Sequence, residues 1–325
     1  MDFQKEIFSI SSESDFNKSA IEVFHFQVNR NRVYREFVNA LSINPERIKH
    51  YCEIPFLPIS FFKSHHVISG GGDPEMTFLS SGTTGMTKSR HQITEMSVYR
   101  QSILAGFNLF FGKVSDYSIL GLVPTPEENP ASSLGYMVDF LMTKAHPREK
   151  NFYLKNFPAL AKKISEQING HRKVMLIGLT SALLEFSEQY PGNYNGMIIM
   201  ETGGMKGKRK ELVREELHGL LCSNLRVEKI YSEYGMTELL SQAYSKGEGL
   251  FFSPPWMKIL IRDTNDPLSL LTGNRTGGVN IIDLANFNSC SFIATQDLGR
   301  GRAGSGFEVL GRFQDSDIRG CNLLS

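Results

Sequence analysis

The order of apolar and polar positions along the chain predicts which parts are helices and which are strands. Residues 15–50 carry apolar side chains at helical spacing, which predicts an N-terminal helical region. From about residue 76 to residue 244, short apolar runs alternate with amphipathic stretches, as where "KVMLIGLT" (173–180) precedes "SALLEFSEQY" (181–190). Strands that alternate with helices in this way indicate an α/β fold with a mostly parallel sheet.

The individual elements follow from the same pattern. We expect strands over 76–81, 117–124, 173–180, 195–204 and 226–235, and helices over 95–111, 133–145, 181–190 and 208–221. Two prolines among aromatic residues predict an extended segment over 53–67. After about residue 245 the helical spacing stops, and β-rich stretches (249–263, 277–284, 291–299 and 306–313) are joined by glycine-rich turns. We therefore expect a helical region over 1–75, an α/β core over 76–244 and a small β subdomain over 245–325.

The composition is that of an ordinary globular protein. The 325 residues include 35 Lys and Arg against 34 Asp and Glu, a balance that favours neither nucleic acid nor an anionic membrane as a partner. No apolar run is long enough to span a bilayer, and the start of the chain lacks the pattern of a signal peptide. The four cysteines (Cys52, Cys222, Cys290 and Cys321) form no CxxC pair. We therefore expect a reduced, cytoplasmic protein without a zinc site or a disulfide framework.

One loop carries a strong chemical signal. The stretch "SSGTTGMTK" (80–88) follows an expected strand and contains small residues, hydroxyls and Lys88. Small residues let backbone N–H groups turn toward one point, which suits a phosphate group. The spacing is neither that of a P-loop (GxxxxGK[ST]) nor that of a dinucleotide fold (GxGxxG). A flexible surface turn is the alternative interpretation of such a cluster.

The loop resembles the phosphate loop "[ST]SG[ST]TGxPK" of the adenylate-forming superfamily, which includes acyl-CoA synthetases and peptide-synthetase adenylation domains. Thr87 stands where that motif has proline, whose ring fixes φ, so we expect a looser loop. Further stretches resemble other motifs of the superfamily, in the same order: "ETGGMKG" (201–207), "YSEYGMTE" (231–238), "TQDLGRG" (295–301) and "GRFQDSDIRG" (311–320).

The resemblance implies a role for each matching residue. The catalytic residues would be Thr84, Lys88, Glu238 and Cys321, and Glu238 would also hold Mg²⁺, which prefers carboxylate and phosphate oxygens. The nucleotide contacts would be Ser80, Ser81, Gly82, Thr83, Thr84, Gly85 and Lys88 of the loop, Gly203, Gly204 and Met205 of the adenine turn, Tyr234, Gly235 and Thr237 near the adenine and the α-phosphate, and Asp297 and Arg312 at the ribose. Taken singly, the 231–238 stretch also fits an ordinary strand end, and the glycine-rich turn fits a plain strand-to-helix connection.

A narrower resemblance concerns "IPFLPISFFKSHHV" (54–67), "ETGGMKG" and "DIRGCNLLS" (317–325), which are similar to the acyl-protein synthetase (LuxE-like) family of this superfamily. It implies the superfamily's large N-terminal domain, made of layered, mostly parallel α/β sheets, with a small C-terminal β subdomain and without the usual mobile C-terminal domain.

The same resemblance implies an acid–thiol ligase. ATP and Mg²⁺ would serve to activate a carboxylic acid, such as a fatty acid, as acyl-AMP with release of pyrophosphate. The acyl group would pass to Cys321 and then to an acyl-accepting protein, either a reductase or a carrier, although a lone cysteine near a C-terminus is usually incidental. Two alternatives stay open: an acyl-CoA or acyl-carrier-protein ligase, and a catalytically incomplete subunit that binds a nucleotide or an acyl-adenylate.

Overall fold

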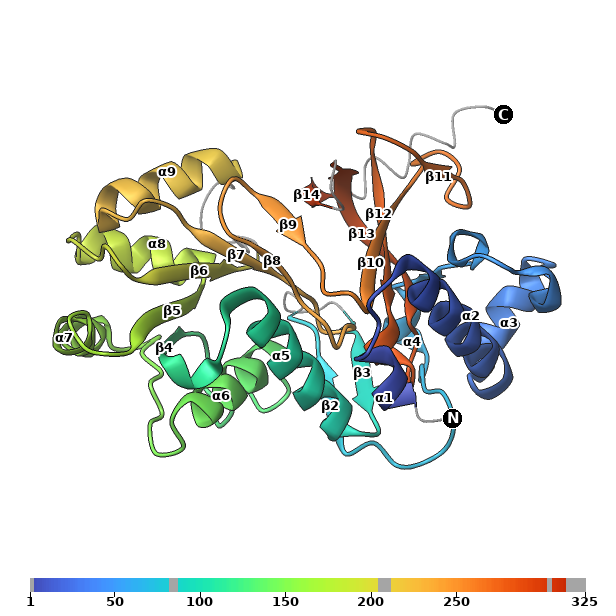
Figure 1. The fold of residues 1–325 in the computed structure, drawn as a ribbon, viewed down its shortest axis with the longest axis horizontal. Helices are drawn as coiled ribbons and strands as arrows, with labels where there is room; N and C mark the ends of the chain where they lie inside the picture. The colour runs from blue at the N-terminus through green and yellow to red at the C-terminus, as the bar shows by residue number, and fades with distance from the viewer. Residues whose placement is uncertain (1–2, 82–86, 204–211, 303–305, 314–325) are drawn as a thin grey trace. The chain divides into compact units, whose positions relative to one another are not determined.

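The chain folds into two compact units (Figure 1). The computed structural model describes residues 3–81, 87–203, 212–302 and 306–313. One unit is continuous and contains residues 74–254, whereas the other combines residues 1–73 with residues 255–325. The N-terminal helices and the C-terminal strands therefore belong to the same unit.

A mixed sheet with the strand order β9-β8-β7-β6-β5-β4 organises the continuous unit. Its strands β4 (Tyr117–Leu122), β5 (Lys173–Leu179), β6 (Ile198–Thr202) and β7 (Tyr231–Tyr234) run parallel, and β8 (Ala243–Ser245) and β9 (Leu250–Phe252) continue it antiparallel. The segment 235–242 between β7 and β8 is too short for the crossover that a parallel pair needs. The expected α/β class is confirmed, and the expected parallel pairing holds for β4 to β7.

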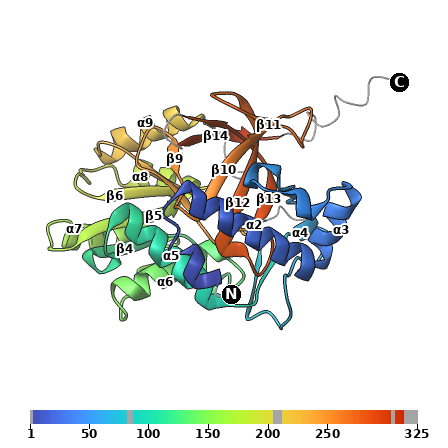
Figure 2. The same ribbon diagram turned by 45° about the vertical axis from the view of Figure 1, so that its right-hand side comes forward.

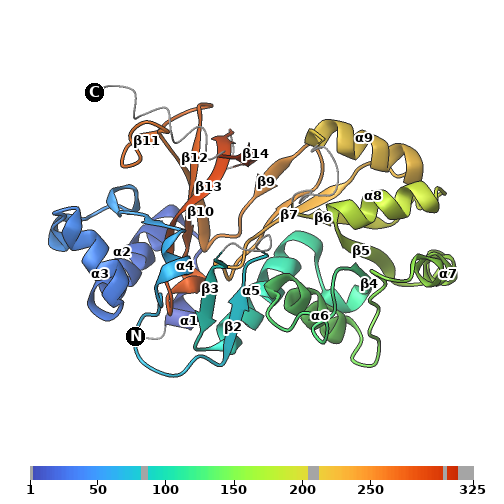
Figure 3. The same ribbon diagram turned by 180° about the vertical axis from the view of Figure 1, so that it is seen from behind.

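Helices cover both faces of this sheet (Figures 1 and 3): α5 (Met96–Phe111), α6 (Ser133–Ala145), α7 (Phe157–Gln167), α8 (Thr180–Gln189) and α9 (Arg214–Leu225). Apolar side chains of α7, α8 and α9 share one buried cluster with Leu120 and Leu176 of the sheet. The α5 helix packs on the opposite face, where the Phe107 ring meets the Tyr117 ring edge-on at 5.4 Å between centroids. Gly178 of β5 permits the close packing of α8, because a Cβ atom at this position would lie 2.9 Å from the Leu183 side chain.

A separate two-stranded hairpin carries the serine- and threonine-rich loop. Its strands β2 (Met76–Leu79) and β3 (Arg90–Ile93) pair antiparallel, with Phe78 opposite His91 (Figure 3). The Leu79 N–H donates to the Ala131 carbonyl at 2.9 Å, which ties the end of β2 to the segment before α6. The hairpin is thus a fixed base from which residues 80–89 extend.

The discontinuous unit pairs helices with antiparallel strands. Its helices are α1 (Phe3–Ile7), α2 (Glu13–Arg30), α3 (Arg32–Ala40) and α4 (Phe61–Ser64), and its strands are β1 (Leu57–Pro58), β10 (Met257–Arg262), β11 (Leu270–Leu271), β12 (Thr276–Asp283), β13 (Phe292–Gly301) and β14 (Phe307–Arg312). The strand order is β11-β10-β12-β13-β14, and β1 pairs in parallel with β13. The extended segment expected over 53–67 ends at β1, because the backbone turns after Pro58 and the Phe62 N–H donates to the Ile59 carbonyl.

The α2 helix lies beside β12 and β13 (Figure 2), and buried amides join the N-terminal helices to the segment between these two strands. The Gln27 side chain donates to the Phe287 carbonyl at 2.9 Å, and the Asn31 side chain donates to the Ser289 carbonyl at 2.9 Å. Both side chains are fully buried. Because a buried polar group is costly without a partner, these bonds fix which surface of α2 faces the strands.

Candidate functional site

The base of the serine- and threonine-rich loop is closed by hydrogen bonds. The Ser80 N–H donates to the Ser89 carbonyl at 3.1 Å, and the Ser89 N–H donates to the Ser80 hydroxyl oxygen at 2.9 Å. Ser81 and Lys88 are exposed beside this closure. The remaining predicted loop residues Gly82, Thr83, Thr84 and Gly85 lie outside the described residues.

A tight turn carries the predicted metal ligand. Beyond β7, the Leu239 N–H donates to the Met236 carbonyl at 3.1 Å, so Thr237 and Glu238 are the two central residues of a β-turn. Glu238 is 4% exposed. Tyr234 ends β7 and packs its ring edge-on against Phe251, with 5.9 Å between the centroids.

A buried histidine joins this turn to the loop. His91 of β3 contacts the Thr237 carbonyl through Nδ1 at 2.7 Å. The hairpin that carries Ser80 and Lys88 therefore lies directly beside the turn that carries Glu238. The structure thus brings together two motifs that are about 150 residues apart in the sequence.

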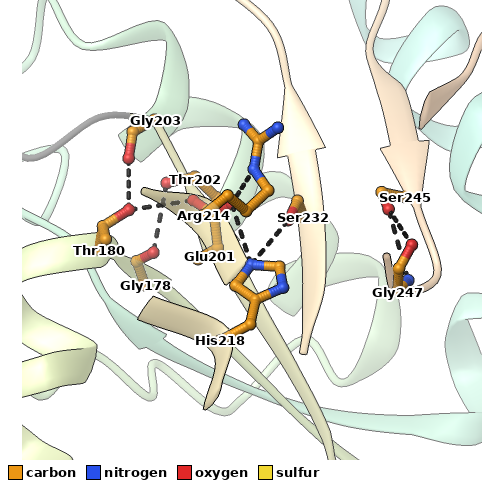
Figure 4. A network of polar contacts seen from close by, with 10 residues as sticks. All are labelled: Gly178, Thr180, Glu201, Thr202, Gly203, Arg214, His218, Ser232, Ser245 and Gly247. Atoms are coloured by element: carbon orange, nitrogen blue, oxygen red, sulfur yellow. Dashed lines mark hydrogen bonds and ion pairs between the residues drawn. The ribbon is translucent and has the colours of Figure 1, made fainter. Parts of the chain in front are cut away.

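The glycine-rich turn after β6 is braced by side chains that the sequence patterns did not single out (Figure 4). Gly203 has a φ of 72°, a conformation that favours glycine. The Thr180 hydroxyl contacts both the Gly203 carbonyl and the Glu201 carboxylate, the latter at 3.0 Å. The predicted adenine-turn residues Gly204 and Met205 lie outside the described residues, so the structure describes this motif only as far as Gly203.

Glu201 is a buried carboxylate with an arginine and a histidine beside it. It is 5% exposed, and its Oε1 atom lies 3.7 Å from His218 Nε2 and 3.8 Å from Arg214 Nε, both from α9 (Figure 4). Burial pushes the pKa of Glu201 upward, but hydrogen bonds from His218 and Ser232 and the charge of Arg214 hold it below its ordinary value. The acid is therefore ionised at neutral pH and ties α9 to the end of β6. One sequence signal could have indicated it, namely a carboxylate at the end of the apolar run "MIIME".

A second carboxyl group, that of Glu233, lies within the 231–238 stretch, and its pKa is raised whereas that of Glu201 is lowered. Burial, with a smaller contribution from the negative charge of Glu201, raises the pKa of Glu233 to about 8. Its Oε1 atom lies against Gly235, only 2.4 Å from where a Cβ atom would be. Within the described residues, no hydrogen bond or ion pair reaches the Glu233 carboxyl group, so the side chain is mostly protonated at neutral pH.

Gln242 adds a buried acceptor next to Gly235. Its side chain is 6% exposed, and its Cγ atom lies 3.5 Å from a Cβ position on Gly235. Within the described part of the chain, the Oε1 atom of Gln242 has no hydrogen-bond partner. A buried acceptor without a partner costs about 1–3 kcal/mol, so a ligand that donates a hydrogen bond here would be favoured.

The two residues predicted at the ribose lie together in the discontinuous unit. Asp297 and Arg312 are direct partners in the β13–β14 ladder, and Arg312 Nε donates to Asp297 Oδ1 at 3.0 Å. Asp297 is 5% exposed and its N–H donates to the Thr295 hydroxyl at 3.1 Å. Arg312 thus orients the Asp297 carboxylate, and the Thr295 hydroxyl holds the Asp297 backbone.

Three other properties bear on the predicted chemistry. The described cysteines, Cys52, Cys222 and Cys290, are free thiols, and the predicted acyl carrier Cys321 lies outside the described residues. In the part of the chain that the structure describes, no cluster of three or more His, Cys, Asp or Glu side chains is arranged to hold a metal. Across the described ranges, no helix combines the length and apolarity that crossing a bilayer requires.

The donor set of the continuous unit fits a magnesium nucleotide. A single carboxylate at Glu238 would leave most magnesium ligands to phosphate and water, as Mg²⁺ prefers at nucleotide sites. The buried Gln242 acceptor fits an amino group such as that of adenine.

Comparison of the sequence with protein-family models and with curated proteins finds no match. Solved structures, in contrast, show a related fold. ATP-bound MatB from Rhodopseudomonas palustris superposes with a TM-score of 0.57 at 14% identity, covering 74% of this chain and 49% of MatB. O-succinylbenzoate coenzyme A synthetase (MenE) from Bacillus subtilis, in complex with AMP, matches with a TM-score of 0.51 at 17% identity, covering 73% of this chain and 49% of MenE.

A third structure matches over almost the whole chain. The open conformation of 2-hydroxyisobutyryl-CoA ligase, in complex with 2-HIB-AMP and CoA, has a TM-score of 0.69 at 10% identity, covering 93% of this chain and 70% of the ligase. The chain thus spans about half the length of MatB and MenE. The α/β class expected from the motifs is confirmed, and the chain has a mixed-sheet α/β fold similar to that of the large N-terminal domain of adenylate-forming ligases.

Proposed function

We propose that this protein activates a carboxylic acid as an acyl-adenylate, using ATP and Mg²⁺, and then transfers the acyl group to a thiol. The observation that carries the proposal is the meeting of two motifs, the loop of Ser80 to Lys88 and the turn of Thr237 and Glu238, joined by the His91 contact. Their order and chemistry match those of a superfamily whose fold this chain shares.

In the first step, a carboxylate oxygen of the acid attacks the α-phosphorus of ATP. A new O–P bond forms while the bond to the bridging oxygen breaks, and pyrophosphate leaves with that electron pair. Backbone N–H groups and hydroxyls of the loop, with Lys88, would bind the phosphate oxygens and stabilise the negative charge that develops. Glu238 would hold Mg²⁺, which when bound supplies positive charge to the phosphates.

In the second step, a thiolate attacks the acyl carbon of the mixed anhydride and AMP leaves. Under the acyl-protein synthetase hypothesis this thiolate belongs to Cys321, and the acyl group then passes to a partner protein. A thiolate is the nucleophilic form of cysteine and is well suited to this acyl transfer. The second candidate is transfer to CoA, which is favoured by the similarity to a ligase whose structure holds both an acyl-adenylate and CoA.

Exchange of labelled pyrophosphate into ATP, measured with a panel of carboxylic acids, tests the first step. At least one acid should stimulate the exchange in the presence of Mg²⁺. Glu238→Gln should lower the exchange rate at least about tenfold, whereas the matched control Glu216→Gln, an exposed acid on α9, should leave it unchanged. Absence of exchange with every acid would leave a nucleotide-binding subunit and refute the ligase proposal.

Acyl labelling of the protein distinguishes the two acceptors. Incubation with ATP, Mg²⁺ and the active acid should leave a thioester that neutral hydroxylamine cleaves, and Cys321→Ser should abolish this label without changing pyrophosphate exchange. Cys52→Ser, which removes an exposed free thiol, is the matched control. A label found only on CoA would support the CoA-ligase reading and exclude the acyl-protein synthetase reading.

A further inference from the structure

His91 lies outside every motif of the sequence, yet it is the contact between two of them. It is fully buried on β3 and faces the Thr237 carbonyl with Nδ1 at 2.7 Å. A carbonyl oxygen can only accept a hydrogen bond, so Nδ1 carries the proton and donates it. This bond is short for an N–H donor and joins segments that are far apart in the sequence.

The carbonyl that His91 holds belongs to the central peptide of a turn. The bond between Met236 and Leu239 closes the ends of the turn and does not involve the peptide between Thr237 and Glu238. Type I and type II turns differ mainly in the orientation of this central peptide, which rotates by about 180° between them. The hydrogen bond from His91 favours one of these orientations, and with it one direction for the Glu238 side chain.

His91 is itself held on a rigid base. The β2–β3 ladder pairs Phe78 with His91, and the Leu79 N–H is bonded to the Ala131 carbonyl at 2.9 Å. On the far side of the turn, the Ser241 hydroxyl meets the Ser102 hydroxyl of α5 at 3.0 Å in a buried contact. The chain beyond the turn and the hairpin beside it are therefore both fixed, and His91 determines the orientation of the peptide between them.

We propose that His91 is a positioning residue: its Nδ1 proton donates to the Thr237 carbonyl and fixes the Thr237–Glu238 peptide. This orients the Glu238 carboxylate toward the metal of the same nucleotide that Ser80 and Lys88 contact. The inference rests on the proposed function, because it assigns Glu238 the metal-binding role. It adds a residue that no motif of the superfamily resemblance includes, and it accounts for a fully buried histidine on a two-stranded hairpin.

Three variants separate the hydrogen bond from packing. His91→Leu removes the donor. His91→Asn keeps a donor, because the Asn Nδ2 atom is as many bonds from the backbone as the histidine Nδ1 atom. Phe78→Leu alters packing at the paired position on β2 without changing the hydrogen bond. We expect His91→Leu to lower pyrophosphate exchange at least about tenfold and to raise the Mg²⁺ concentration needed for half-maximal rate. His91→Asn should restore both values to within about threefold of the original protein, and Phe78→Leu should leave the Mg²⁺ requirement unchanged.

Deuterium exchange in the ligand-free protein tests the same bond without reference to activity. Peptides covering residues 234–240 should exchange faster in His91→Leu than in the original protein, and His91→Asn should reverse this change. Unchanged exchange in His91→Leu, or an equal effect of Phe78→Leu, would overturn the positioning role. If the original protein shows no pyrophosphate exchange with any acid while the deuterium result holds, the proposed function fails and the role of His91 in the turn stands.

Discussion

Replacing Glu233 with glutamine should stabilise the protein, and increasingly so as the pH rises. In the folded chain, burial and the charge of Glu201 raise the pKa of Glu233 to about 8 from its ordinary value of 4.5. In the unfolded chain the side chain regains its ordinary acidity. Glutamine has nearly the same shape and cannot ionise, so the substitution removes only the free energy linked to the proton.

The sign follows from proton binding. Between pH 4.5 and 8 the folded state holds a proton on Glu233 that the unfolded state has lost, so stability falls as the pH rises through this window and is fully retained below it. Each tenfold change in acidity corresponds to about 1.4 kcal/mol, so the linked loss is about 1 kcal/mol at pH 5, about 3 kcal/mol at pH 7 and about 4 kcal/mol at pH 8. Glu233→Gln should recover these amounts.

Urea unfolding of both proteins at pH 5, 6, 7 and 8 measures the effect. The difference in free energy of unfolding between Glu233→Gln and the original protein should grow by about 3 kcal/mol across this series. Glu216→Gln, on the exposed side of α9, should give a small and constant difference. Parallel curves for Glu233→Gln and the original protein would show that Glu233 ionises normally in the fold and would refute the reasoning.

Four further substitutions, one of them a control, test the fold around the site. Glu201→Gln should lower the free energy of unfolding by about 2–3 kcal/mol at pH 7, and because the folded pKa of this acid is depressed, the loss should shrink as the pH falls below 4.5 in a urea series. Gly178→Ala should lower the free energy of unfolding by about 1–3 kcal/mol, because the added methyl group would lie 2.9 Å from the Leu183 side chain. The control Gly219→Ala, which has open space around it on α9, should raise the free energy of unfolding by up to about 1 kcal/mol in the same assay. Arg262→Met should lower the thermal midpoint by several degrees, because the buried guanidinium donates to the Val279 carbonyl at 2.8 Å and to Asn280 at 2.9 Å; an unchanged midpoint would contradict this.

The parallel part of the fold could be predicted because its strands are buried on both faces. All six residues of β4 are buried, so the strand is a continuous apolar run in the sequence. The α6 helix was predicted over its observed range, since Ser132 caps its start and apolar residues follow at helical spacing. Where burial and local capping agree, the pattern alone is sufficient.

Other elements carry too little local signal. The β3 strand reads "RHQI" and pairs with only one neighbour, so no apolar run marks it. The α7 helix was not predicted, although Asn156 caps it and Pro158 lies in its first turn. The helix expected over 208–221 is observed as α9 from Arg214, and residues 204–211 lie outside the described ranges. These features depend on tertiary contacts or on caps that the apolar spacing alone does not reveal.

The residues of the candidate site also divide into those that a sequence motif predicts and those that it does not. Tyr234, Thr237 and Glu238 could be predicted as site residues because a motif names them, and their roles stay predictions. The same holds for Asp297 and Arg312, which the structure shows as direct hydrogen-bond partners. The supporting side chains were not found. His91 and Glu201 act through contacts with residues 146 and 17 positions away, and no pattern in a single sequence reports such pairs.

The buried amides that join α2 to the β12–β13 segment have a consequence for the order of folding. The partners of Gln27 and Asn31 follow them by about 260 residues, so these bonds cannot form until Phe287 and Ser289 have left the ribosome. The continuous unit of residues 74–254 has no such delay, because all of its own strands are made in one stretch. During synthesis the apolar face of α2 therefore lacks the strands on which it packs while the middle of the chain folds. Translation speed and chaperones should thus affect the yield of the discontinuous unit more than that of the continuous one.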